Sequence, residues 1–336
     1  MTATRETMTS APDASPDYTD RGPAPDGFAE PSHQNRPWVR RISSVLKVAI
    51  IIAVIAYLIL RLSQIGWGDV WTSLPTNPAF YLIFLAIYLS LPLSEIVIYR
   101  KLWQRPLRSA FPVLLRKQVL NFGVIGYSGE AYFIFWAREK LALRRRVIFH
   151  AIKDNNILSA IASNALTLIL LFAFFASGEL DRFMVNDENA ELYVGLTAGF
   201  SLLLLPTLYI LRRRIFALGA RLGLVILGIH FGRLLVVQVL QAGQWAVALP
   251  DVPFTAWLMF LTLQMVLTRI PFLPNKDLIF LGAGLSLTGA VDAPEAAVAA
   301  MFLAAGACTQ LVNLLAFTTA TVWERLHPVT SATNGS

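Results

Sequence analysis

Residues 121–140, NFGVIGYSGEAYFIFWAREK, form an apolar segment that has basic residues on both sides and is broken by glycines. The segment is too short to cross a bilayer, because a spanning helix needs about 20 consecutive apolar residues. It also contains a carboxylate, Glu130, in a sequence environment where lipid would disfavour a charge. The charges and apolar runs on either side of this segment indicate how it folds.

The composition is that of an integral membrane protein. Hydrophobic residues make up 56% of the 336 residues, and the mean hydropathy is +0.58. We expect an all-α, polytopic bundle with about six spanning helices, because several apolar runs have the necessary length of about 20 residues. The predicted helices are residues 42–62, 79–99, 148–175, 192–211, 222–249 and 296–323.

Basic residues gather in the segments that join these runs on one side. They precede the first run, follow the second up to Lys117, precede the third and separate the fourth from the fifth, whereas residues 66–78 and 250–253 contain none. Cytoplasmic loops carry such an excess of Lys and Arg. We therefore expect a multi-pass protein of the bacterial inner membrane with both termini in the cytoplasm. The net charge of +7 reflects topology, and no nucleic-acid partner is expected.

The chain divides into three parts by composition. Residues 1–35 are rich in Pro, Ser, Asp and Gly and are expected to form a disordered acidic tail, either simply solvated or able to bind a basic partner. Residues 36–328 form the membrane domain, and residues 329–336 form a second disordered tail. The N-terminal tail has no apolar run, so the first membrane helix is expected to serve as the insertion signal.

The segment that contains residues 121–140 is predicted to be a re-entrant hairpin. Residues 107–143 have basic residues on both sides, so the segment enters and leaves on the same face. Each half would span only about 21–24 Å as a helix, which is less than the roughly 30 Å of the hydrocarbon core. Its break, GVIGYSG, has backbone groups that must be buried in protein or line a cavity.

Residues 254–291 are apolar and interrupted in the same way, but their flanks, PDVP and DAPE, lack basic residues. This second hairpin would therefore enter from the outer face. Residues 42–175 and 192–323 then form two halves of an inverted-topology repeat. Such repeats place binding sites near the midplane, where broken helices meet.

Two carboxylates, Glu130 and Asp277, lie at the expected starts of the second half-helices. Ser128-Gly129-Glu130 and Asn275-Lys276-Asp277 each offer a capping residue followed by an acid, which suits a helix N-terminus. The carboxylates either complete helix ends or pair with cations and relay protons in a shared cavity.

Three basic residues within apolar sequence are candidates for substrate binding: Arg233, Arg269 and Lys153. Arginine has a planar, permanently charged fork that suits phosphate or carboxylate. The alternative for Arg269 is an internal salt bridge to Glu130 or Asp277. Lys153 could instead pair with its neighbour Asp154 or extend its ammonium group to the membrane surface.

The remaining candidates for substrate contact are four amides: Asn121, Asn156, Asn275 and Gln241. For the Gln and Asn side chains of the helices, hydrogen bonding between helices is the favoured role over ligand contact. His230 is expected to be a packing histidine, and Glu95 is expected to form an ion pair at the membrane interface. No metal site and no cofactor are expected, because Cys308 is the single cysteine and His230 has no second ligand one turn away.

The stretch NFGVIGYSGE, the basic run before it, and KDNNILSAIASNALTLILL after it resemble the lysylphosphatidylglycerol synthase/flippase transmembrane-domain family. The loop RIPFLPNKDLIFLGAGL adds to this resemblance, which covers most of residues 42–323. The family's usual second loop is rich in proline and glycine and is followed by a glutamate, where this chain has Asn275, Lys276 and Asp277. The resemblance implies a flippase for aminoacylated or glycosylated lipids. Larger members carry a soluble aminoacyl-transfer domain, for which residues 329–336 leave no room.

The expected function is therefore binding and translocation of a lipid or lipid-linked headgroup through a midplane cavity between the two hairpins. Membrane lipids with an anionic or phosphate-containing headgroup are the expected partners, together with a homo-oligomer or an envelope-synthesis partner. Two alternatives stay open: a proton- or ion-coupled small-solute transporter, and a non-transporting scaffold of envelope-lipid synthesis. We do not expect an enzyme, because the sequence has no HExxH motif, no Ser/His/Asp order and no paired catalytic carboxylates.

Overall fold

The computed structural model describes residues 66–107, 110–123, 128–141, 143–177, 216–269, 276–290 and 293–326, with a few further positions between 52 and 199. Within these ranges every regular element is a helix, which confirms the all-α class. The two predicted tails, most of the first and fourth predicted helices, and residues 124–127 and 270–275 of the hairpin breaks lie outside the described residues, and Asn275 lies outside with them.

Four helices of the described part are long and apolar enough to cross a membrane. They are α3 (Pro78–Trp103), α6 (Arg145–Ala176), α9 (Ala220–Ala248) and the Glu295–Thr319 portion of α12 (Glu295–Leu326). They correspond to the second, third, fifth and sixth predicted helices. Large apolar side chains such as Leu82, Phe172 and Val239 are exposed on them, as a lipid-facing surface requires.

Each interrupted apolar region folds as a pair of short helices. The first pair is α4 (Ala110–Gly123) and α5 (Ser128–Leu141), and the second is α10 (Phe254–Arg269) and α11 (Lys276–Ser286). Two small elements complete the described part: α2 (Trp67–Thr72) and the 3-10 turn η1 (Thr288–Ala290). The order from α3 to α6 is long, short, short, long, and the order from α9 to α12 is the same.

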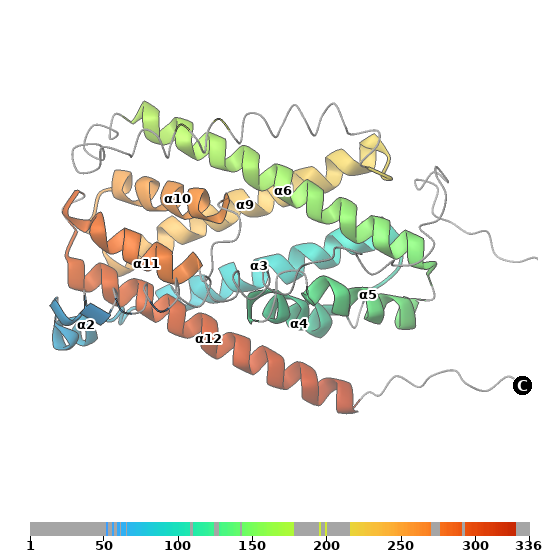
Figure 1. Ribbon diagram of the computed structural model, residues 1–336, viewed down its shortest axis with the longest axis horizontal. Helices are drawn as coiled ribbons and strands as arrows, with labels where there is room; N and C mark the ends of the chain where they lie inside the picture. The colour runs from blue at the N-terminus through green and yellow to red at the C-terminus, as the bar shows by residue number, and fades with distance from the viewer. Residues whose placement is uncertain are drawn as a thin grey trace, which may run out of the picture.

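The hairpins of these two sets of four helices pack in corresponding ways. Helix α4 contacts α3, α5 and α12, and helix α10 contacts the corresponding helices α9, α11 and α6. Helices α5 and α11 each pack on the long helix that follows them, and α3 packs against its counterpart α9. Each hairpin therefore rests on a long helix of the other set (Figure 1).

The two hairpins begin at opposite ends of the molecule, because α3 and α9 run antiparallel. Near the C-terminal end of α3, Arg105 donates a hydrogen bond to the carbonyl of Leu141 at 3.0 Å, which fixes the base of the α4–α5 hairpin. At the other end of the same pair, the Gln244 side chain of α9 donates to the carbonyl of Phe80 at 3.1 Å. In Figure 1, α10 and α11 accordingly lie toward the left of the bundle and α5 toward the right.

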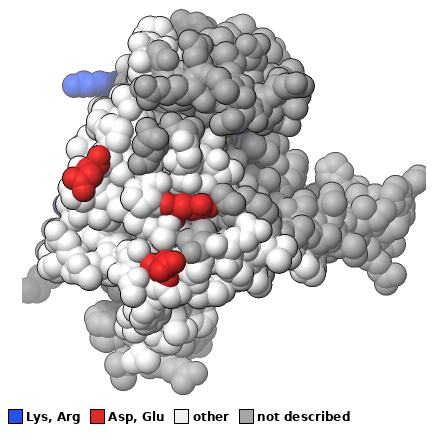
Figure 2. Space-filling model, turned by 90° about the vertical axis from the view of Figure 1, so that its left-hand side faces the viewer, with Lys and Arg blue, Asp and Glu red and all other residues white. Residues whose placement is uncertain are grey.

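The ends of the bundle differ in charge. The end that holds α2, the turn between α9 and α10 and the start of α12 carries acidic side chains, as Figure 2 shows. The acidic residues that these three segments contribute are Asp69, Asp251 and Glu295. The end that holds the C-terminal ends of α3 and α5 and the starts of α6 and α9 is basic. Its described residues include Arg100, Lys101, Arg105, Arg138, Lys140, Arg145 and Arg221.

Each hairpin packs beside an aromatic cluster. Tyr99, Trp103 and Phe133 stack between α3 and α5, with ring centroids 4.8–5.6 Å apart. Trp245 lies against Phe280 and other rings at the second hairpin. The close packing there requires Gly284, because a Cβ at this position would lie 2.8 Å from Cε2 of Phe302.

Candidate functional site

The tip of the α4–α5 hairpin is held by a very close approach of the two helices. A Cβ placed on Gly129 would lie 2.1 Å from the carbonyl oxygen of Lys117, so only glycine fits there. The Asn121 side chain accepts a hydrogen bond from the Gly129 N–H at 2.8 Å and donates one to Glu130 Oε1 at 3.0 Å. Asn121 thus satisfies an N-terminal amide of α5 and also orients the carboxylate in its first turn.

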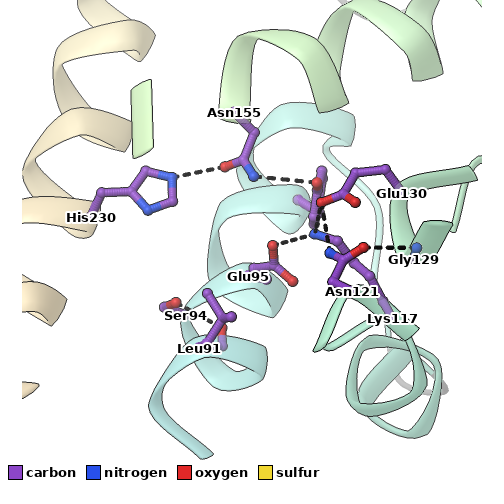
Figure 3. Close-up of polar contacts among 10 residues, drawn as sticks. Leu91, Ser94, Glu95, Lys117, Asn121, Gly129, Glu130, Asn155 and His230 are labelled. Carbon is purple, nitrogen blue, oxygen red and sulfur yellow. Dashed lines mark hydrogen bonds and ion pairs between the residues drawn. The ribbon is translucent and has the colours of Figure 1, made fainter. Parts of the chain in front are cut away.

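Three charged side chains meet beside this tip. Lys117 of α4 forms a hydrogen-bonded ion pair with Glu95 of α3, and its Nζ lies 3.7 Å from Oε1 of Glu130. The side chains of Lys117 and Glu95 are 4% and 7% exposed, and that of Glu130 is 13% exposed. One buried lysine therefore serves two carboxylates that come from different helices (Figure 3).

Aromatic rings surround the lysine. Its Nζ lies 5.8 Å from the ring centroid of Tyr99 and 5.7 Å from that of Phe133. Both distances are within the range in which a ring face attracts a cation. Together with the two carboxylates, these rings hold the ammonium group where little water reaches it.

A second set of hydrogen bonds connects this site to α6 and α9. Asn155 donates to the Tyr99 hydroxyl at 3.3 Å, and its Oδ1 lies 2.9 Å from Nε2 of His230 (Figure 3). One turn further along α9, Arg233 interacts electrostatically with Glu95. Its Nε is buried and has no hydrogen-bond partner among the described residues. We call Glu95, Lys117, Glu130 and Arg233 the four-charge cluster.

The tip of the α10–α11 hairpin has a different character. Arg269 donates to Ser163 Oγ at 2.7 Å and to Thr268 Oγ1 at 3.0 Å, so its described hydrogen bonds go to neutral hydroxyls. Lys276 donates to the carbonyl of Thr268 at 2.8 Å and lies within electrostatic range of Arg269. In the described part of the chain, no carboxylate pairs with either cation.

The alternative in which Arg269 forms a salt bridge with Glu130 or Asp277 is therefore wrong for this conformation. Glu130 binds Lys117 and Asn121, and Asp277 lies exposed in the first turn of α11. Both acids do begin the second helix of a hairpin, as the sequence predicted.

Both hairpin tips reach the middle of long helices. The Gln118 side chain, near the end of α4, donates to the carbonyl of Tyr88 halfway along α3, at 3.4 Å. Ser163, the partner of Arg269, lies in the middle of α6. Asn155 and Ser163 are eight positions apart on α6, which corresponds to about 12 Å along the helix. The polar groups of the two tips therefore lie within a narrow band across the bundle.

Three further candidates lie outside the two hairpin tips. Lys153 and Gln241 have partners within the protein, and no partner of Asn156 is shown among the described residues. Lys153 lies 3.2 Å from Asp154, as the alternative proposed, and Asp154 accepts hydrogen bonds from the amides that precede α9. Gln241 donates to Gln244, which links α9 to α3. Asn156 is half-buried, and its neighbour Asn155 takes part in the cluster instead.

Lys117, Asn155 and Glu95 were not recognised as site residues from the sequence. Lys117 was expected in the cytoplasm with other basic residues, but it is 3% exposed and lies inside the bundle. Glu95 was expected to form an interfacial pair, but it is buried against Lys117. The signal that could have identified both is their position: an acid and a base within apolar sequence, each facing the interior.

No protein family, no curated protein and no solved structure matches this chain in comparisons with known proteins. Among the described residues, no group of three His, Cys, Asp or Glu side chains could hold a metal ion.

Proposed function

We propose that this protein binds the phosphate-containing headgroup of a membrane lipid between its two hairpin tips and moves it across the membrane. The observation that carries the proposal is the cation pair of Arg269 and Lys276 at the tip of the second hairpin. Two like charges held close together destabilise each other unless an anion binds between them. Neutral hydroxyls hold the Arg269 guanidinium, which leaves its charge for a phosphate oxygen.

The arrangement of helices supports a re-entrant, inverted architecture for this activity. The hairpins of the two sets of four helices pack in corresponding ways, and α3 and α9 run in opposite directions, as an inverted repeat requires. Helices α4, α5, α10 and α11, at 11–16 residues each, are too short to cross the bilayer. The basic and acidic ends support a cytoplasmic position for the bases of α4 and α5 in a bacterial inner membrane.

The proposed path runs between the tips. A headgroup would exchange contacts from one hairpin to the other while its acyl chains stay in lipid. The sequence has no GxxxxGK[ST] nucleotide-binding motif, so the movement would be downhill or coupled to an ion. The resemblance to the lysylphosphatidylglycerol flippase domain agrees with this class of substrate.

Replacement of Arg269 tests the proposal. We expect Arg269→Ala to abolish headgroup movement, because the variant removes the fork that binds phosphate, while folding stays largely intact. The measurement is quenching by dithionite of fluorescently labelled phosphatidylglycerol in proteoliposomes. Arg138→Ala is the matched control, because Arg138 lies exposed near the end of α5, and it should move lipid at the wild-type rate. Lipid movement by Arg269→Ala as fast as by wild type would show that this residue assignment is wrong.

A second candidate is a proton-coupled transporter of small anionic solutes. The observation that favours it is the buried group of two carboxylates and one lysine at the first tip, which is a chemistry suited to proton exchange. Proteoliposomes distinguish the two candidates. Uptake of a soluble organic phosphate without movement of labelled lipid would favour the solute transporter.

A further inference from the structure

We infer that the four-charge cluster takes up one proton, on Glu130, when a phosphodiester monoanion binds to Arg233. This inference rests on the proposed function and adds to it a coupling ion. It concerns the chemistry of the site at the first hairpin, which the proposed contacts of Arg269 do not involve.

The charges of the cluster balance in the structure as described. Lys117 and Arg233 contribute two positive charges, and Glu95 and Glu130 contribute two negative ones. Lys117 forms its hydrogen bond with Glu95, whereas Glu130 lies 3.7 Å from the ammonium group. Glu130 is therefore the more weakly compensated of the two acids.

An anion at Arg233 disturbs this balance in one direction. Arg233 interacts with Glu95, and its buried Nε has no described partner, so the guanidinium can donate to a phosphate oxygen. Lys117 is then the only cation that compensates the charge of Glu95. The attraction between Lys117 and Glu130 is weakened as a result. An uncompensated carboxylate at this depth is costly, and protonation removes the charge.

Glu130 has a free position for the proton. Its Oε1 accepts the hydrogen bond from Asn121, and its Oε2 is buried without a hydrogen-bond partner among the described residues. A hydronium ion of the solvent supplies the proton: one of its O–H bonds breaks, an O–H bond forms at Oε2, and a water molecule is released. The cluster then carries three charges that, together with the bound monoanion, sum to zero.

The other groups near Glu130 do not compete for this role. From α3 it faces Glu95 and Tyr99, from α4 Lys117 and Asn121, and from α6 Asn155. His230 of α9 contacts Asn155 on the side away from Glu130 (Figure 3), and Arg233 follows His230 by one turn of α9. On α6, His150, Lys153 and Asp154 interact with one another, and Asp154 is fixed by the amides of Ala217 and Leu218.

Calorimetry on the full-length protein in phosphatidylcholine nanodiscs tests the inference. The probes are dimethyl phosphate and dihexanoyl phosphatidylglycerol, which carry the same phosphodiester charge without and with acyl chains. Titration in two buffers of different ionisation enthalpy should show uptake of about one proton per bound anion. The dissociation constant should then rise with pH, by up to about tenfold per pH unit, because one proton is taken up with each anion. Proton uptake with both probes would indicate that the site recognises phosphodiesters in general. Proton uptake with the lipid probe alone would indicate that the natural ligand is a lipid headgroup.

Variants assign the proton to its residue. In Glu130→Gln, proton uptake should fall to near zero, and the altered affinity should no longer depend on pH. Glu139→Gln, at an exposed position on the same helix, should leave the uptake unchanged. Binding by the unaltered protein without proton uptake overturns the coupling but leaves headgroup binding in place, even if Glu130→Gln does not fold. Absence of binding by either probe at every pH overturns the proposed function itself, and full uptake by Glu130→Gln overturns the assignment to Glu130.

Discussion

At the scale of single residues, the centre of the first hairpin depends on one lysine shared by two acids. Glu95 and Lys117 are 22 positions apart, and Glu130 is a further 13 positions along, so the three helices α3, α4 and α5 meet at one ammonium group. Desolvation of these charges is costly, and each is tolerated only because the others are present. Removing one of these charges should therefore lower the stability of the protein more than removing an acid and the lysine together.

We predict that Lys117→Met destabilises the protein by about 3–5 kcal/mol, because it leaves two buried carboxylates without their cation. Combining it with Glu95→Gln should restore part of this loss. The measurement is unfolding in detergent, followed by thermal denaturation or by denaturant. Lys101→Met is the control, since Lys101 is exposed on α3, and it should change stability little. A single variant as stable as the double variant would contradict the shared-lysine account.

The choice of site residues shows what sequence can and cannot predict at this scale. Glu130, Arg233, Arg269 and Asn121 were recognisable as polar residues within apolar sequence, and the structure places each of them at or next to a hairpin tip or the four-charge cluster. Asn156 was preferred to Asn155, because a shift of one residue turns a side chain by about 100° around a helix and the apolar pattern did not fix that rotation. The partners of Lys117 come from other helices, and spacing within one helix carries no information about them.

At the scale of elements, the two hairpins share a closing contact. In each, the first residue of the second helix donates a side-chain hydrogen bond to a backbone carbonyl eight positions earlier: Ser128 to Leu120 at 2.9 Å, and Lys276 to Thr268 at 2.8 Å. The last carbonyls of a helix have no partner within it, so these side chains satisfy groups that lipid could not. The sequence predicted the short helices, because basic residues on both sides of residues 107–143 indicated that the segment enters and leaves on the same face. It did not predict the closing contacts, which depend on how closely the two helices approach.

We predict that Gly129→Ala disrupts the first hairpin, because the added Cβ would lie 2.1 Å from a backbone oxygen that cannot move without the whole of α4. Gly228→Ala is the matched control on α9, where nothing lies within 4 Å of the added carbon. This control should be neutral or slightly stabilising, since alanine favours a helix over glycine by up to about 1 kcal/mol. Yield of monodisperse protein and thermal stability are the measurements. Equal behaviour of the two variants would rule out the close approach at Gly129.

At the scale of the whole molecule, the difference in charge between the two ends predicts which end faces the cytoplasm, and this orientation can be measured. The base of the first hairpin lies at the basic end and that of the second at the acidic end. The side with more Lys and Arg is the cytoplasmic side in membrane proteins.

We therefore predict the sides from which introduced cysteines react, in a chain whose Cys308 is replaced by serine. Lys101→Cys and Lys140→Cys flank the first hairpin and should react only with reagent supplied from the cytoplasmic side. Asp251→Cys and Ser286→Cys flank the second and should react only from the outside; all four positions are exposed. Reaction of the two flanks of either hairpin on different sides would mean that the segment crosses the membrane, and the proposed shared site would be lost.

The contact between α4 and α12 has a consequence for how the chain assembles during synthesis. Helix α4 is among the first described elements to emerge from the ribosome, and α12 is the last. Until α12 has been inserted, the side of the first hairpin that α12 covers has no protein against it. The charged tip of this hairpin is then part of an incomplete bundle. A chaperone or insertase that shields this side would act on the nascent chain until α12 has been made.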